Sequence, residues 1–276
     1  MAKEFNRRRD DRRRDDRPRR DDFRRKEEDV EENEGQLEGR NALSEALRSG
    51  RTIDKVFIAS GETDQGLQRL AAQAKEAGAV VVPVDRRKLD YMSATGAHQG
   101  VIALAAAREY CSIDDILQEA ADRGEAPLIV ICDELTDPHN LGAILRSGEC
   151  AGVHGVIIPK RRSVGLTAVV AKASAGAVEY MKVARVTNIN AAIEELKEKG
   201  VWVFGTAAEG SIPMYKADLT GPTAIVIGSE GDGMSRLVRQ NCDVIVHIPM
   251  KGRITSLNAS CAATILLYEA VRQRLS

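Results

Sequence analysis

The chain contains 276 residues with a formal net charge of −1, and 43% of them are hydrophobic but only 4% aromatic. This length exceeds the roughly 100 to 200 residues of a typical domain, so we expect two compact units. The apolar stretches fall far short of the about 20 residues that cross a bilayer, and we expect no membrane-spanning helix. The charged amino terminus has no apolar signal-peptide core, which predicts a cytoplasmic protein.

The cysteines and histidines form no pattern typical of a metal site or a disulfide framework. Five cysteines and four histidines are spread along the chain without CxxC or HxxxH spacing. An odd number of cysteines in mostly apolar surroundings is typical of reduced core residues. We therefore expect no metal.

Residues 1–35 predict a disordered, charged tail. Its first 34 residues hold 13 basic and 13 acidic side chains and very few apolar ones. Such a segment cannot bury enough apolar surface to offset the entropy lost on ordering. The arginine blocks fit an electrostatic arm for RNA or a solubilising tail, and the interleaved aspartates leave both interpretations open.

Residues 36–108 predict a small α/β domain. A helical spacing of apolar residues follows Gln36 and ends at Gly50. The elements expected next are a strand, a helix and two more strands, over residues 55–59, 65–77, 80–84 and 101–106. Residues 109–126 predict a linker containing a helix, for which Ser112 is a possible cap.

Residues 127–276 predict a larger α/β domain in which short apolar strands alternate with helices. The expected strands cover residues 128–132, 155–158, 180–183, 201–205, 224–228 and 244–248. The expected helices cover residues 141–151, 189–199, 234–241 and 258 to about 274. This alternation predicts a mostly parallel sheet with helices on both faces.

Three polar segments follow strands of this sheet, at the edge where open parallel sheets bind ligands. They read DELTDPHNLGAILR from residue 133, IVIGSEGDG from residue 225 and IPMKGRITSLN from residue 248. In the first, Gly142 would allow a ligand or a neighbouring backbone to approach closely. Each segment alone has an ordinary explanation. Asn140 is a possible helix cap and Arg146 a solvated charge, while Ser256 or Asn258 is a possible cap of the last helix.

The order and spacing of the three segments is more specific than any one of them. The pattern is N-x-G-x-x-x-R, then IGSEGDGM, then IPMxGxxxSLNxxxAxxxxxYE. It resembles the SpoU/TrmH family of SPOUT methyltransferases over residues 36–276. In the small domain, EGRNALSEAL and GAHQGVIA look like the L30e-like substrate-binding domain of rRNA-directed members. The arrangement is most similar to the 23S rRNA guanosine-2′-O-methyltransferases.

This resemblance implies a methyl donor, a fold and a set of site residues. It implies S-adenosylmethionine-dependent methylation of a ribose 2′-hydroxyl in ribosomal RNA, a carboxyl-terminal trefoil knot and a homodimer. Backbone groups of three residues would hold the adenosine part of the donor: Gly228, Ile248 and Leu257. The implied catalytic residues are Arg146, Asn140, Glu230, Ser256 and Asn258.

The role of Arg146 stays open between two interpretations. A guanidinium with a pKa above about 12 is a poor base at neutral pH. Arg146 therefore either loses a proton only in the assembled site, or holds a phosphate and stabilises the developing alkoxide.

Several polar residues are candidate contacts to RNA. Basic side chains after a predicted strand and in the third segment suit phosphates: Lys160, Arg161, Arg162, Lys251 and Arg253. The alternative is a solvated surface cluster. On the small domain the candidates are Arg40, Asn41, His98 and Gln99, although a histidine beside a glycine is more often structural.

Three other functions fit parts of the sequence. A tRNA ribose 2′-O-methyltransferase would share the large domain, and a non-catalytic RNA-binding ribosome-assembly factor would share the fold. A Rossmann-type enzyme would share the alternating strands, but the glycine-rich turn is neither a dinucleotide fingerprint nor a P-loop.

Overall fold

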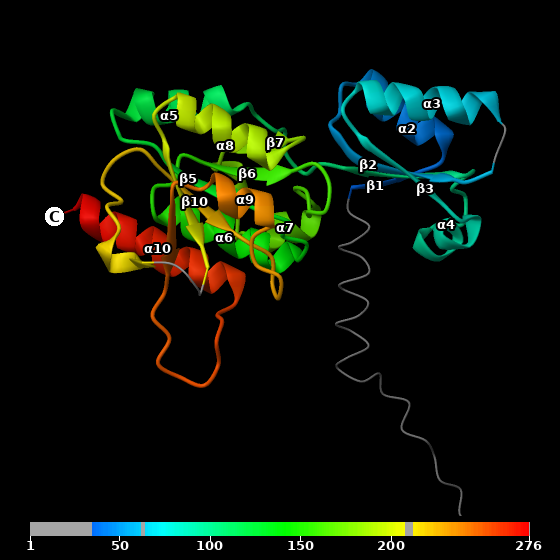
Figure 1. The fold of residues 1–276 in the computed structure, drawn as a ribbon. Coiled ribbons are helices and arrows are strands. Elements are labelled where there is room, and N and C mark those ends of the chain that lie inside the picture. Colours follow the sequence, from blue (N-terminus) through cyan, green and yellow to red (C-terminus); the bar gives the residue numbers. More distant parts are fainter. Residues whose placement is uncertain (1–34, 62–63, 208–211, 276) are drawn as a thin grey trace, which may run out of the picture.

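The computed structural model describes residues 35–61, 64–207 and 212–275. The predicted disorder of residues 1–34 lies outside them. Two α/β units lie side by side, each with its own sheet (Figure 1). We call the unit with the four-stranded sheet the small domain and the unit with the seven-stranded sheet the large domain. Among the described helices, none is long and apolar enough to span a bilayer.

The small domain is a mixed sheet with helices on both faces. Its strand order is β1-β4-β2-β3, with only β2 and β3 parallel. The strands are β1 (Gln36–Glu38), β2 (Ile53–Ala59), β3 (Val80–Val84) and β4 (Val101–Ala105). Alternate residues of β2 face opposite sides, as strand geometry requires. Val56 and Ile58 pack with α2 (Arg40–Arg48) and α3 (Gln65–Glu76), whereas Ala59 packs with α4 (Arg86–Met92).

The large domain has a seven-stranded sheet in which every strand pair is parallel. The order is β7-β6-β5-β10-β8-β11-β9. The strands are β5 (Leu128–Cys132), β6 (Gly155–Pro159), β7 (Val183–Val186), β8 (Trp202–Thr206), β9 (Ile212–Pro213), β10 (Thr223–Ile227) and β11 (Val244–His247). The predicted mostly parallel sheet is thus confirmed. Because all strands run the same way, their carboxyl ends meet at one edge.

Helices cover both faces of this sheet, each over its own apolar core. One face carries α6 (Pro138–Cys150), α7 (Ala168–Ala173) and α10 (Ala259–Arg274); the other carries α5 (Ile113–Arg123), α8 (Ile189–Glu198) and α9 (Arg236–Asn241). Short 3₁₀ helices precede β7 (η1, Ala177–Glu179) and β10 (η2, Met214–Lys216). The α5 helix, expected in a linker, packs into the large domain through Ile113 and Ile116. Ser112 caps it, as predicted.

Two predicted elements begin three residues away from their expected start. The strand expected over residues 180–183 begins only at Val183, because η1 precedes it and Tyr180 is exposed. The helix expected from residue 141 begins at Pro138, capped by the Asp137 side chain. Asn140 is therefore not the cap: it lies inside the first turn of α6, and its side chain can reach across the sheet edge.

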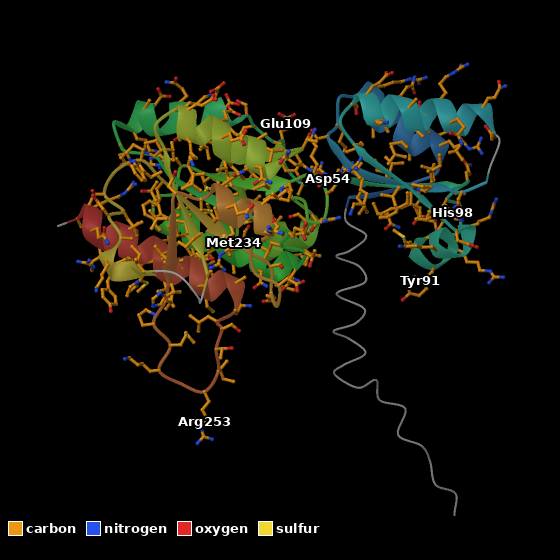
Figure 2. The ribbon with its side chains drawn as sticks, in the orientation of Figure 1. Asp54, Tyr91, His98, Glu109, Met234 and Arg253 are labelled. Atoms are coloured by element: carbon orange, nitrogen blue, oxygen red, sulfur yellow. The ribbon has the colours of Figure 1, made fainter. Side chains whose placement is uncertain are left out.

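A buried ion pair joins the two domains. Arg185 on β7 donates through Nη1 to Oδ1 of Asp54 on β2 at 2.7 Å, and Tyr110 donates to Asp54 Oδ2 at 2.9 Å. Both charged side chains are only 7% exposed, and Figure 2 places Asp54 where the domains meet. Burial raises the pKa of the Asp54 carboxyl, and Arg185 counteracts this effect.

We predict that Arg185→Met strongly destabilises the protein. It leaves the Asp54 carboxylate buried without its partner, which costs about 3 to 5 kcal/mol of unfolding free energy. The matched control is Arg123→Met, which breaks an exposed pair with Glu119 and should cost less than about 1 kcal/mol. Urea denaturation followed by circular dichroism measures both. Equal losses for the two variants would show that the domain contact contributes no more than a surface ion pair.

Candidate active site

Three segments that are far apart in sequence meet at the carboxyl edge of the large sheet. Asn140, in α6 after β5, donates from Nδ2 to Oε1 of Glu230, in the turn after β10, at 2.7 Å. Asn258, before α10, donates from Nδ2 to Asn140 Oδ1 and to Glu230 Oε1, both at 2.8 Å. We call these three residues the polar triangle. Each belongs to a different predicted segment, so the structure brings three of the five candidate catalytic residues together.

The Asn258 side chain is oriented by the helix that it caps. Its Oδ1 accepts the backbone N–H groups of Ser260 and Cys261 at 3.0 and 3.3 Å. This capping occupies the oxygen and turns the amide nitrogen toward the other two members of the triangle. The amide of Asn258 thus links the start of α10 to both other segments.

The turn that carries Glu230 requires glycine. A Cβ on Gly228 would lie 2.2 Å from the backbone carbon of Gly233, which no larger residue could tolerate. Ser229 and Gly233 exchange two backbone hydrogen bonds of 3.0 Å. Gly231 and Gly233 have φ of 92° and 68°, in the left-handed region that favours glycine. The IGSEGDG motif therefore encodes a closed loop that presents Glu230.

Asp133 supports this turn and was missed by the sequence reasoning. It is 4% exposed, and its Oδ2 accepts the backbone N–H of Ser235 at 2.7 Å. Its own N–H donates to the Ile227 carbonyl at 2.8 Å. A signal was available, because Asp133 directly follows the fully apolar strand β5, where a carboxylate is buried only if it has partners.

Residues 249–257 have an unpaired backbone beside the polar triangle. Within the described chain no backbone hydrogen bond involves these residues. They run between β11 and α10 as a projecting loop (Figure 1), with Arg253 at its far end (Figure 2). Met250, Ile254 and Leu257 expose 39%, 73% and 39% of their surface. Free amides and carbonyls next to exposed apolar side chains suit a ligand with an aromatic base and a polar edge.

Of the other candidates for the donor site, Gly228 is buried and Ile248 packs against the large core. Ser256 is exposed in the loop and makes no hydrogen bond within the described part of the chain. The structure therefore does not join Ser256 to the polar triangle.

Arg146 also lies apart from the triangle. It is six residues beyond Asn140 in the same helix, which places the two side chains about 120° apart around the axis of α6. Its side chain is exposed, and no hydrogen bond or ion pair to it exists among the described residues.

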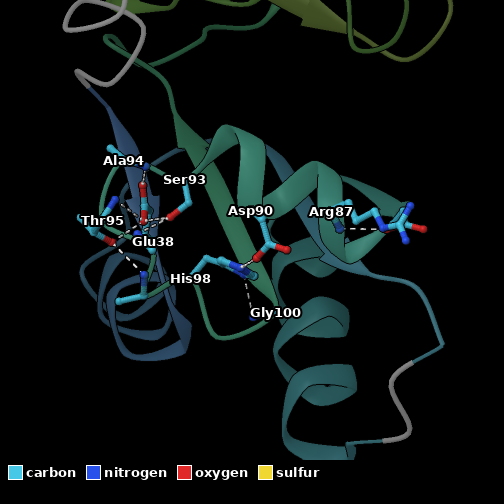
Figure 3. A network of polar contacts seen from close by, with 11 residues as sticks. Glu38, Arg87, Asp90, Ser93, Ala94, Thr95, His98 and Gly100 are labelled. Atoms are coloured by element: carbon cyan, nitrogen blue, oxygen red, sulfur yellow. Dashed lines mark hydrogen bonds and ion pairs between the residues drawn. The ribbon is translucent and has the colours of Figure 1, made fainter.

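The candidate RNA contacts of the small domain mostly hold one loop in place. His98 is 3% exposed; its Nδ1 accepts the Gly100 N–H at 3.1 Å and its Nε2 lies 2.9 Å from Asp90 Oδ1 (Figure 3). Arg40 donates to the Gln99 carbonyl at 3.1 Å and to Asp64 at 2.6 Å. Asn41 is exposed. The EGRNAL and GAHQG motifs therefore pack against one another.

Glu38 organises the other end of this loop. Its carboxylate accepts the Ser93 hydroxyl and the Ala94 N–H, both at 2.6 Å, and also bonds with Thr95 (Figure 3). Burial alone would raise the pKa of Glu38, but these donors outweigh it and lower the pKa to about 2. The loop is thus anchored by an ionised side chain.

The candidate basic residues of the large domain differ in their pairing. Arg162 donates to Glu134 at 3.0 Å. Lys160 and Arg161 have no carboxylate partner within the described residues, and Lys251 and Arg253 are exposed in the loop of residues 249–257. In the described chain, no group of three histidine, cysteine, aspartate or glutamate residues could hold a metal ion.

Both domains match known families. Residues 127–268 match the SpoU rRNA Methylase family, and residues 36–111 match the family described as RNA 2′-O ribose methyltransferase substrate binding. The protein therefore belongs to the SpoU/TrmH class of RNA methyltransferases, as its motifs indicated. It is an RNA 2′-O-methyltransferase that uses S-adenosylmethionine.

Individual relatives support this assignment over most of the chain. YacO of Bacillus subtilis, assigned to the TrmH family of tRNA/rRNA methyltransferases, is 49% identical over 236 residues, covering 86% of this chain and 94% of its own. Among solved structures, the SpoU methyltransferase AviRb of Streptomyces viridochromogenes with bound S-adenosylmethionine is similar with a TM-score of 0.57 and 26% identity, covering 94% and 95% of the two chains. An rRNA methyltransferase of Sinorhizobium meliloti with the same cofactor has a TM-score of 0.56 and 26% identity, covering 87% and 88%.

We predict that Asn258→Ala and Asn188→Ala have similar effects on stability but different effects on the site. Each removes an N-cap, of α10 or of α8, and should cost about 1 kcal/mol of unfolding free energy. Only Asn258→Ala also breaks the polar triangle, so it alone should weaken S-adenosylmethionine binding, by roughly 10-fold or more. Thermal unfolding and calorimetric titration measure the two effects. Equal affinity in both variants would exclude the triangle from the donor site.

Proposed function

We propose that the protein methylates the 2′-hydroxyl of a guanosine ribose in 23S rRNA. The observation that carries the proposal is the polar triangle, which lies at the carboxyl edge of the sheet beside a loop with an unpaired backbone. The free amides and carbonyls of the loop suit the methyl donor, and the triangle places polar side chains next to this loop. The backbones of Gly228, Ile248 and Leu257 would hold the adenosine part.

Ribosomal RNA is favoured over tRNA by the domain content of the similar structures. The S. meliloti rRNA methyltransferase matches 87% of this chain, which includes both domains. The A. aeolicus TrmH/SpoU tRNA modifying enzyme, at 30% identity and a TM-score of 0.51, matches only 55% of this chain. The rRNA enzyme thus matches both domains of this chain and the tRNA enzyme only about half of it, which supports ribosomal RNA as the substrate.

The side chains of the site would position the ribose and assist removal of its proton. When bound, S-adenosylmethionine would supply the methyl group for the 2′-oxygen and leave as S-adenosylhomocysteine, while the hydroxyl proton would pass to solvent. Asn140 and Asn258 present amide groups whose orientation is fixed by Glu230 and by the α10 cap, so little reorganisation is required. Ser256 adds a hydroxyl from the loop. Lys251 and Arg253, also in the loop, and Arg162 and Asn41 are further proposed contacts to RNA.

Arg146 would act across a homodimer interface. Within one chain it projects about 120° from Asn140 around the axis of α6, which supports a site in which the Arg146 that faces the ribose belongs to a second copy. The surface for pairing is formed by α6 and α10, which pack together through a 2.7 Å hydrogen bond between Ser147 and Thr264. On α10, Tyr268 is 48% exposed, and Leu275, which caps the end of this helix, is 83% exposed. A two-fold axis here would create two equivalent composite sites.

In such a site Arg146 would hold a phosphate next to the target ribose and stabilise the developing alkoxide. This role needs only its permanent charge, whereas general-base catalysis needs a deprotonated guanidinium.

We also infer that the carboxyl-terminal segment is threaded as a trefoil knot, and that the protein acts in the cytoplasm. The resemblance of the last two motifs to the SpoU family supports the threading.

The substrate is tested by methylation of purified RNA. With tritiated S-adenosylmethionine, the protein should label unmodified 23S rRNA at one guanosine ribose and leave tRNA unlabelled. Labelling of tRNA alone would favour the tRNA enzyme. Absence of methyl transfer to either RNA, with no binding of the donor, would favour a non-catalytic RNA-binding factor.

Complementation tests the shared site. Arg146→Ala and Asn140→Ala homodimers should each be nearly inactive. About half of randomly mixed dimers contain one subunit of each variant. If Arg146 acts on the other subunit, one of the two sites in such a dimer carries neither change. About one quarter of all sites are then intact, so roughly a quarter of wild-type activity should return. If Arg146 acts within its own chain, every site would keep one defect and mixing would restore nothing.

A further inference from the structure

A basic cleft lies between the two domains. Its volume is about 470 Å³, within the roughly 300 to 1,000 Å³ of typical ligand clefts. The small domain contributes one face of α3 and the start of β3. The large domain contributes Lys160 and Arg161, directly after β6, and Thr187, directly after β7.

The α3 side of the cleft is a single helical face. Gln68 and Lys75 each lie three or four residues from both Ala71 and Ala72, so the four residues form one row along the helix. The small side chains of the two alanines leave space in the cleft, and Lys75 adds a cation at the end of the row. From the opposite side, Lys160 reaches the small domain: its Nζ lies 3.9 Å from the point where a Cβ on Gly78 would be.

The three cations of the cleft lack neutralising partners. Within the described residues, no acidic side chain lines the cleft, and Lys75, Lys160 and Arg161 make no ion pair. Other cations nearby are paired, as Arg162 is with Glu134 and Arg185 with Asp54. Like charges gathered in a concave site repel one another and focus a positive potential, which favours an anionic ligand.

The cleft is held in shape by the domain contact next to it. Arg185 donates through Nη2 to the Asp54 carbonyl at 3.0 Å and to the Lys160 carbonyl at 3.5 Å. The Lys160 N–H donates to the Val186 carbonyl at 2.8 Å. The backbone that positions Lys160 is therefore tied to both domains, so the cations are brought together before any ligand arrives.

The cleft also lies on the edge that carries the active site. β6 is the neighbour of β5 in the parallel sheet. Lys160 follows the carboxyl end of β6, and Asn140 lies in the helix that follows β5. A strand of RNA that reaches the polar triangle along this edge would pass the cleft.

We propose that this cleft binds phosphodiester groups of the substrate RNA where the strand passes from the small domain to the large domain. The described residues that line it include no aromatic side chain on which a base would stack, so the cleft recognises the backbone. Lys75 is the contact contributed by the small domain. This inference rests on the proposed function, because it concerns the same RNA.

The test is the salt dependence of RNA binding. The triple variant Lys75→Gln, Lys160→Gln, Arg161→Gln is compared with Arg69→Gln, which removes a charge from α3 outside the row that faces the cleft. Lys216→Gln serves as a control on the large domain. Filter binding of deproteinised 23S rRNA and, separately, of tRNA is measured over a range of salt concentrations. Calorimetry with S-adenosylmethionine and circular dichroism show whether the fold and donor site remain intact.

We expect the triple variant to bind 23S rRNA roughly 10-fold or more weakly. The slope of log affinity against log salt concentration should become shallower by about 2 to 3, because each lost phosphate contact reduces this slope by about 0.7 to 0.9. The control variants and donor binding should be unchanged. An unchanged slope in the triple variant, or an equal loss in Arg69→Gln, would overturn the proposal, as would binding of inorganic phosphate in the cleft without any effect on RNA. RNA binding through the cleft without methyl transfer would instead contradict the proposed function alone.

Discussion

The polar triangle of Asn140, Glu230 and Asn258 is the interaction on which the active site depends. Its three members are at least 28 residues apart in sequence, and each hydrogen bond joins two different segments. Asn258 takes part twice, because its oxygen caps α10 while its nitrogen bonds to the others. The parallel sheet makes this possible, since the carboxyl ends of β5 and β10 lie side by side.

The ion pair between Asp54 and Arg185 holds the two domains together, as the polar triangle holds the three segments of the site. It fixes the small domain beside the sheet edge, and through the Lys160 carbonyl it also connects to the basic cleft. A buried pair of this kind adds less net stability than its short distance suggests, because both ions lose their hydration. Its main consequence here is geometric: RNA bound by the small domain would be presented to one defined edge of the large domain.

The sequence allowed the sheet and the site to be predicted because both depend on local patterns. Alternating apolar strands and helices indicated a parallel sheet, and the order of three motifs indicated that Asn140, Glu230 and Asn258 belong to one site. Asp133 and the Asp54–Arg185 pair were missed, since a buried carboxylate is recognised by a partner that is distant in sequence. The side-chain direction of Arg146 also could not be predicted, because it depends on whether α6 begins before or after Asn140.

The functional account depends most on the claim that residues 249–257, with their unpaired backbone beside the triangle, hold the methyl donor. Hydrogen–deuterium exchange of the full chain with and without S-adenosylmethionine tests it directly. The account predicts rapid exchange of these amides in the free protein, since they lack hydrogen bonds, and clear protection when the donor binds. Protection confined to other segments, with residues 249–257 exchanging equally fast in both states, would contradict it.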